Sequence, residues 1–280
     1  MKRIIISLLA LVWPSLALAA SHSSQKPTPK QARELMASVC RSGAATGACS
    51  VCPEFVEGGG LGGKMTPTAV TYGKFLNTKD VYALLDLSGC EAHVYNFGGS
   101  VLLRWRGLTR WDFVKYIPGL RSGDCLKYPA QGYPAQGGRE ALLCEGGYAG
   151  MGVVDTSLFQ VDLARFVAGT SDEPDYRALF LLEDSTGACL STATVQSLLS
   201  WQQVNLNGDA LPDLRVKLRS GSGKTGQTSE QCGALVPNIS TRPYTLEYTF
   251  DGKHFTPTQS TRATIKQLLK DNPYLLGDGN

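Results

Sequence analysis

The sequence predicts a mainly β, antiparallel domain, either β-propeller-like or a β-sandwich, reinforced by disulfides and with short helices at its N- and C-terminal ends. Three observations lead to this fold class. Several short stretches alternate apolar and polar residues with the period of a β-strand, as 244–250 does. Turn-forming pairs such as Asp251-Gly252 separate such stretches. The third observation is an even number of cysteines behind an export signal: Cys40, Cys49, Cys52, Cys90, Cys125, Cys144, Cys189 and Cys232.

The first 19 residues have the pattern of a cleaved secretory signal peptide. Lys2 and Arg3 form a basic start, an apolar run follows from Ile4, and Ala17-Leu18-Ala19 supplies small residues for cleavage. Pro14 interrupts the apolar run, which is shorter than the roughly 20 residues that a membrane-spanning helix needs. We therefore expect a periplasmic or secreted protein that keeps no membrane anchor after signal cleavage.

The charge of the mature chain argues against a nucleic-acid partner. Removal of Lys2 and Arg3 with the signal peptide leaves 25 Lys and Arg against 24 Asp and Glu. Proteins that bind nucleic acid carry a basic patch or stripe, and this chain intersperses the two signs. We expect no nucleic-acid partner.

In an oxidising compartment, eight cysteines predict up to four disulfides, and the sequence leaves their pairing open. A zinc site is the metal alternative, because Cys49, Cys52, Cys90 and His93 have the C-x-x-C and C-x-x-H spacing of zinc ligands. Such a site uses three thiolates and leaves five cysteines, an odd number. Disulfides are therefore favoured.

Residues 20–79 are expected to hold an N-terminal helix and a segment rich in cysteine and glycine. Thr28 is a suitable N-cap, Pro29 suits the first helical position, and Gln31 completes the spacing of a capping box. Apolar residues then recur at helical spacing up to Val39. These signals predict an amphipathic helix of about three turns.

Residues 80–280 are expected to form the β-rich domain. Its strand-like stretches fall into two parts, 80–170 and 176–260, which predicts either one domain or two similar β lobes. A short helical turn is expected at 194–201. A C-terminal helix is expected at 261–270, where apolar residues recur at helical spacing and Pro273 follows.

The most specific motif lies in the stretch 204–218, where Gly208 allows a sharp turn. The candidate ligands for a hard cation such as Ca²⁺ are the side chains of Asn205, Asn207, Asp209 and Asp213 and the carbonyl of Leu211. Only two of these residues carry a carboxylate, so we expect weak binding, with a Kd of roughly 10⁻⁴ to 10⁻³ M. The alternative is an Asx-rich turn that leads into a strand.

These residues resemble the D-x-N-x-D-G-x-x-D-L loop of FG-GAP and VCBS-type repeats. The resemblance covers residues 205–214 in a single copy, and it implies a calcium loop within a β-propeller. Two positions depart from the family pattern. Asn205 replaces the aspartate that is the first ligand, and Ala210 replaces the glycine that follows the third ligand. The rest of the chain has the general features of an exported bacterial protein.

Two classes of function are consistent with the sequence. The first is a non-enzymatic binding or interaction protein whose partner is a protein or a glycan, contacted by loops and aromatic side chains such as Trp105 and Trp111. Both tryptophans alternate with charged residues, so we expect them to be core residues rather than contacts. The second class is a secreted hydrolase with a site assembled around His93 or His254. The binding hypothesis is preferred, because no catalytic motif is found and Glu140 and Glu145 are spaced for opposite faces of a strand.

Overall fold

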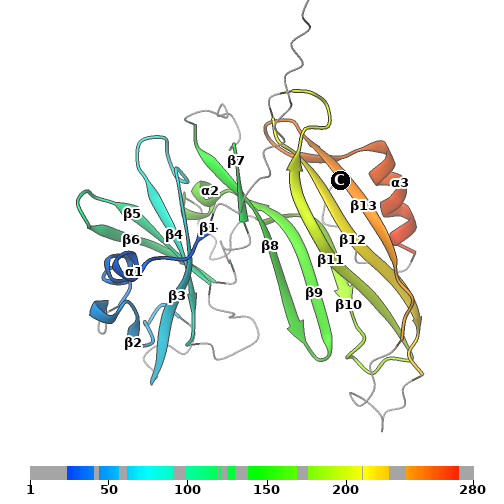
Figure 1. Ribbon diagram of the computed structural model, residues 1–280, viewed down its shortest axis with the longest axis horizontal. Helices are drawn as coiled ribbons and strands as arrows, with labels where there is room; N and C mark the ends of the chain where they lie inside the picture. Colours follow the sequence, from blue (N-terminus) through cyan, green and yellow to red (C-terminus); the bar gives the residue numbers. More distant parts are fainter. Residues whose placement is uncertain are drawn as a thin grey trace, which may run out of the picture.

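The computed structural model describes residues 24–40, 44–56, 62–90, 99–118, 120, 125–129, 138–168, 176–209, 211–226 and 238–270. Within these ranges the chain forms fourteen β-strands in two antiparallel sheets, together with three α-helices (Figure 1). The predicted mainly β fold class is confirmed. The strands do not close into a propeller, and the β-sandwich is the predicted architecture that fits. The predicted signal peptide lies outside the described residues.

The N-terminal half of the described chain forms a six-stranded sheet. Its strand order is β1-β3-β4-β5-β6, with β2 paired to β3. The strands are β1 (Ser24–Gln25), β2 (Cys49–Val51), β3 (Gly62–Gly73), β4 (Tyr82–Ser88), β5 (Ser100–Trp105) and β6 (Trp111–Ile117). A 3₁₀ turn at Ala44–Thr46 precedes β2.

Helix α1 (Pro29–Met36) covers one face of this sheet, as the capping signals predict. The Thr28 hydroxyl accepts a hydrogen bond from Gln31 N at 3.3 Å, and Thr28 N donates to the Gln31 side chain at 2.9 Å. Leu35 and Met36 are fully buried against the sheet. The predicted N-terminal helix is confirmed.

The remaining strands form one eight-stranded sheet in which every strand lies beside the strand that precedes it in the chain. They are β7 (Cys125–Pro129), β8 (Glu140–Gly150), β9 (Val153–Val161), β10 (Tyr176–Asp184), β11 (Thr192–Val204), β12 (Asp213–Lys224), β13 (Arg242–Phe250) and β14 (Phe255–Pro257). Helix α2 (Leu163–Ala168) follows β9, and α3 (Gln259–Leu268) packs on β13 and β14.

This long sheet folds back on itself between β10 and β11. These two strands pair only at Asp184 and Val195, so they diverge beyond that point. The space between the two halves is filled by apolar side chains, such as Phe180 from β10 and Leu246 from β13. Trp201 of β11 reaches across to Glu145 of β8 with an Nε1–Oε2 hydrogen bond of 3.3 Å. The result is a β-sandwich made from one continuous meander.

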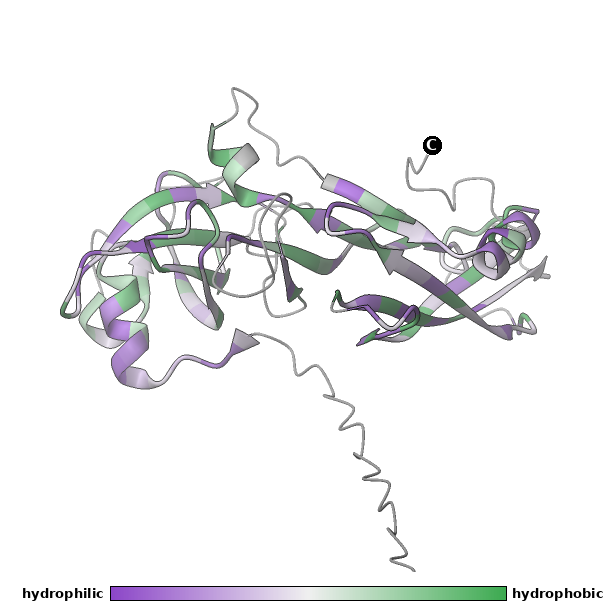
Figure 2. Ribbon diagram, turned by 90° about the horizontal axis from the view of Figure 1, so that it is seen from above, coloured by the Kyte–Doolittle hydropathy of each residue, from purple (hydrophilic) through white to green (hydrophobic). Residues whose placement is uncertain are grey.

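A separate core joins the two sheets. Leu84 and Leu102 of the N-terminal sheet pack with Leu142 and Phe159 of the long sheet and with Phe166 of α2. The first part of β8, from Ala141 to Cys144, is therefore buried on both faces. The N-terminal sheet and the sandwich lie along the long axis of the molecule (Figures 1 and 2). Figure 2 shows that hydrophobic segments run along the strands of both units.

Three disulfides reinforce these cores: Cys40–Cys49, Cys52–Cys90 and Cys125–Cys144. Cys189 is disulfide-bonded as well, while Cys232 lies outside the described residues. The first two bridges use the three cysteines of the zinc alternative, which is therefore wrong. Disulfides of this kind persist in an oxidising environment.

Some predicted elements differ from the observed ones. The predicted helical turn at 194–201 is wrong, because these residues are part of strand β11. The C-terminal helix begins two residues earlier than predicted, with Thr258 as its N-cap. Strand β3, which the sequence assigns to the 20–79 segment, pairs with β4 along seven residue pairs, so the N-terminal sheet spans that predicted boundary. Within the described ranges no helix has both the length and the apolar character needed to cross a bilayer.

Two hairpin turns carry large apolar residues in a strained conformation. Leu108, between β5 and β6, has φ 51° and is 93% exposed. Met151, between β8 and β9, has φ 52° and is 97% exposed. The left-handed region costs a residue with a Cβ about 1 kcal/mol or more. Neither side chain is buried, so apolar burial does not offset this cost.

Candidate functional site

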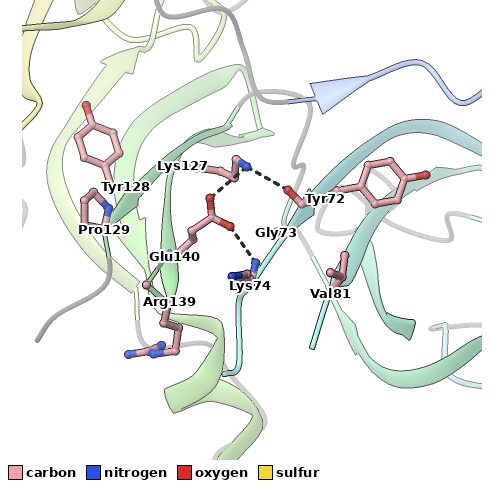
Figure 3. Close-up of a pocket in the computed structure, with 10 residues that line it drawn as sticks. Tyr72, Gly73, Lys74, Val81, Lys127, Tyr128, Pro129, Arg139 and Glu140 are labelled. Carbon is pink, nitrogen blue, oxygen red and sulfur yellow. Dashed lines mark hydrogen bonds and ion pairs between the residues drawn. The ribbon is translucent and has the colours of Figure 1, made fainter. Parts of the chain in front are cut away.

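A pocket of about 440 Å³ lies where the N-terminal sheet meets the first strands of the long sheet (Figure 3). This volume is within the usual range for small-molecule sites. The end of β3, the start of β4, strand β7 and the start of β8 all contribute to it. Its lining residues are Tyr72, Gly73, Lys74, Val81, Lys127, Tyr128, Pro129, Gly138, Arg139 and Glu140. We call it the seam pocket.

One ion pair fixes the floor of the seam pocket. The Lys127 ammonium lies 3.1 Å from Glu140 Oε1 and donates a hydrogen bond of 3.2 Å to the carbonyl of Tyr72. The other oxygen of Glu140 accepts a hydrogen bond of 2.8 Å from Lys74 N (Figure 3). A Cβ at Gly73 would lie 2.7 Å from that same oxygen, so glycine leaves the room that the contact needs. The pair thus ties β3 to β7 and β8.

A second ion pair anchors the neighbouring wall. The Arg139 guanidinium binds the Asp162 carboxylate in a bidentate manner, and the Nη2–Oδ2 contact measures 2.7 Å. The two side chains are only 10% and 17% exposed. Asp162 Oδ1 also accepts a hydrogen bond of 3.0 Å from Ala164 N in the first turn of α2. This pair therefore holds β8 against α2 and leaves little capacity for a ligand.

Lys74 is the third cation that lines the seam pocket. The side chain of Lys74 has no ion-pair or hydrogen-bond partner among the residues that the structure describes. The positive charges of Lys127 and Arg139 are matched by Glu140 and Asp162, so the excess charge at the pocket is that of Lys74. An ammonium group in this position suits a ligand with an acidic group.

The two tyrosines of the pocket are neutral at physiological pH. Burial raises the pKa of Tyr128, whose ring points away from the pocket into the sandwich core (Figure 3). Burial also raises the pKa of Tyr72, although the hydrogen bond from Gln31 acts in the opposite direction. These residues therefore add no negative charge to the lining, and the Tyr72 ring packs against Trp111 in the N-terminal core.

The predicted calcium loop lies elsewhere, between β11 and β12. Its side-chain oxygens accept hydrogen bonds from the loop's own backbone: Asn205 from Gly208 N at 2.6 Å, and Asp209 from Leu211 N at 2.7 Å. Asn207 likewise accepts from the backbone of Asp209 at 3.1 Å. These contacts are the ones that the alternative, an Asx-rich turn, requires.

Asp213 of the same motif is fully buried rather than turned toward the loop's exterior. Its carboxylate accepts hydrogen bonds from Leu206 N at 2.7 Å and from Phe250 N at 2.9 Å. It therefore joins the start of β12 to the end of β13. Calcium binding at 205–213 and the FG-GAP resemblance stay predictions.

The histidines of the hydrolase hypothesis are not among the residues that line the seam pocket. His254 lies in the turn between β13 and β14, where its backbone N donates a hydrogen bond of 2.6 Å to Asp251. The pKa of Asp251 is low: burial acts to raise it, but this bond and one from Lys253 N outweigh burial. His93 lies outside the described residues.

The sequence did not identify the seam pocket. Lys74, Lys127 and Arg139 are ordinary charged residues beside strand ends, far apart in the chain. The order of strands in the sequence does not predict that β3 contacts β7. The only local signal of a close approach is the glycine at the end of β3, Gly73.

Trp105 and Trp111 were expected in the core, and they do pack together there, with ring centroids 4.9 Å apart and Trp111 buried.

Comparison of the chain with family models, with curated proteins and with solved structures found no match.

Proposed function

We propose that this protein is an exported, non-enzymatic binding protein that holds a small ligand with an acidic group in the seam pocket. The observation that carries the proposal is Lys74, which lines a pocket of about 440 Å³ and whose ammonium has no partner among the described residues. The surrounding charges are matched with each other. The disulfides support the export part of the proposal, because such bonds persist in oxidising compartments.

The rigidity of the pocket supports binding as its role. Two cores and two ion pairs fix its walls, so little conformational entropy is lost when a ligand enters. Val81 is 42% exposed and Pro129 lies on the opposite wall (Figure 3), so the lining offers apolar surface as well as charge. A small organic anion with an apolar portion fits these features best.

The proposal is tested by thermal unfolding of the oxidised protein in the presence of phosphate, succinate, citrate, glutamate or glucuronate. An anion at ten times its Kd adds about 1.4 kcal/mol of stability, which raises the midpoint by roughly 3 to 6 °C. We expect at least one organic anion to do so.

Three variants locate the effect. Lys74→Gln removes the charge and Val81→Glu places a carboxylate at the rim, and both should abolish the shift. Lys217→Gln is the matched control, because Lys217 is an exposed lysine on β12 with no side-chain partner among the described residues. A shift that persists in Lys74→Gln, or no shift with any of these anions, would contradict the proposal.

A further inference from the structure

The turn between β5 and β6 combines an exposed, left-handed apolar residue with a cluster of arginines. Its apex residue, Leu108, is 93% exposed and left-handed, with φ 51°. Its flanking residues Arg106 and Arg110 close the hairpin with backbone hydrogen bonds. A Cβ at Gly107 would meet nothing within 4 Å, so the turn stands free of the rest of the protein.

The choice of leucine at this apex is unfavourable for the isolated protein. A glycine or asparagine would adopt the left-handed conformation with less strain and would also be better solvated. Single exposed apolar residues are ordinary on protein surfaces, but an exposed apolar residue that is also strained is not. A contact that buries Leu108 would account for its presence.

The charges around the turn indicate the chemistry of that contact. Arg104, Arg106 and Arg110 all direct their guanidinium groups at one carboxylate, that of Asp112, at 3.8, 2.5 and 3.8 Å. Three positive charges thus share one negative charge. The side chain of Arg110 is 81% exposed. The turn therefore presents an apolar apex surrounded by excess positive charge.

The shape of the hairpin favours a membrane surface over a protein. Figure 1 shows the β5–β6 hairpin projecting at the end of the N-terminal sheet, at the left of the view. A convex tip with one apolar side chain covers far less than the roughly 1,000 Å² that a specific protein interface needs. A bilayer accepts a single inserted side chain, and its phosphates attract nearby arginines.

We propose that the β5–β6 hairpin docks the protein onto an anionic lipid surface. Leu108 enters the boundary between headgroups and acyl chains, while Arg106 and Arg110 contact the lipid phosphates. The interaction is peripheral and reversible, and it is independent of the seam pocket.

The test is sedimentation of the protein with vesicles of equal parts phosphatidylglycerol and phosphatidylcholine, compared with vesicles of phosphatidylcholine alone. We expect binding to the anionic vesicles only, and weaker binding as salt is raised from 0.1 to 0.5 M. Leu108→Ser should lower the partition coefficient more than tenfold. Arg110→Gln should lower it about fivefold.

Two further variants make the test specific. Asp112→Asn removes the negative charge that the three arginines share, so it should strengthen binding to the anionic vesicles. General damage to the hairpin would weaken binding instead. The unfolding midpoint of this variant is measured to show that the hairpin is intact. Met151→Ser is the matched control, because Met151 is equally exposed and left-handed but lies on another hairpin. Its binding should equal that of the wild type.

Three results would overturn the proposal. These are equal sedimentation with both vesicle types, unchanged binding by Leu108→Ser, and no sedimentation with vesicles at all. The last result would leave the hairpin as the contact of a protein partner instead.

Discussion

The ion pair between Arg139 and Asp162 should be the most important electrostatic contact for the stability of the seam. Its two side chains are 10% and 17% exposed, and Arg139→Gln would leave the Asp162 carboxylate at a largely buried position without its cation. Breaking a buried pair from one side costs about 3 to 5 kcal/mol. Asp162 keeps its hydrogen bond from Ala164 N, so we expect the lower end, about 3 kcal/mol.

The control is Arg215→Gln, which breaks the pair between Arg215 and Glu247. That pair is equally short, at 2.7 Å, but its side chains are 38% and 28% exposed. Exposed pairs contribute about 0 to 1 kcal/mol, because solvent screens the charges. The comparison isolates burial as the cause of the difference.

Urea unfolding at 25 °C measures both variants. With an m value of about 3 kcal/mol/M, the midpoint should fall by about 1 M in Arg139→Gln and by no more than about 0.3 M in Arg215→Gln. The double variant Arg139→Met with Asp162→Asn removes both charges and should recover most of the loss, since the cost comes from the uncompensated charge. Equal losses in the two single variants would refute this reasoning.

Four other predictions concern single side chains. The Tyr248 hydroxyl is buried with no hydrogen-bond partner among the described residues, so Tyr248→Phe should leave the free energy of unfolding unchanged or raise it by up to about 1 kcal/mol in urea titrations. Burial, followed by the charge of Glu183 directly across the ladder, raises the pKa of Asp155. Since a raised carboxyl pKa means that stability is lost as pH rises through it, Asp155→Asn should raise the unfolding midpoint at pH 7 and not at pH 3.5. Asp213→Ala should cost at least about 2 kcal/mol with or without calcium, because two backbone N–H groups lose their acceptor. Asp209→Ala should abolish any rise in midpoint that millimolar calcium produces, and no rise in the wild type would leave the loop as an Asx turn.

Local signals in the sequence predicted local structure well. The capping box at Thr28 and Gln31 predicted the start of α1, and the alternation in 244–250 predicted β13. The turn at Asp251-Gly252 is also where the sequence predicts it. In each case the determining contacts lie within a few residues of each other.

The prediction of secondary structure failed at 194–201, where the two-residue alternation of a strand is interrupted. The register of β11 shifts between Leu198 and Ser200, which moves later side chains to the other face. Leu198 and Trp201 then fall at a spacing of three residues, which resembles one side of a helix. Such a spacing favours a helical turn over a strand when it is read from the sequence.

The candidate site was beyond the reach of the sequence for a different reason. The Lys127–Glu140 pair and the backbone contact to Lys74 join β3 to β7 and β8, and they depend on how two sheets pack. The core that packs those sheets is built from residues spread between Phe75 and Phe166. Hydrophobic periodicity shows that such residues are buried, but it does not show which of them meet.

The most direct test of the central claim is titration calorimetry of the oxidised protein with whichever organic anion raises its unfolding midpoint most, repeated on Lys74→Gln and Lys217→Gln. A charge-assisted hydrogen bond contributes about 1.5 to 3 kcal/mol, so loss of the Lys74 ammonium should weaken binding at least about tenfold, while Lys217→Gln binds as the wild type does. Equal affinity of Lys74→Gln and the wild type, or no binding of any anion, would contradict the assignment of the seam pocket as the ligand site.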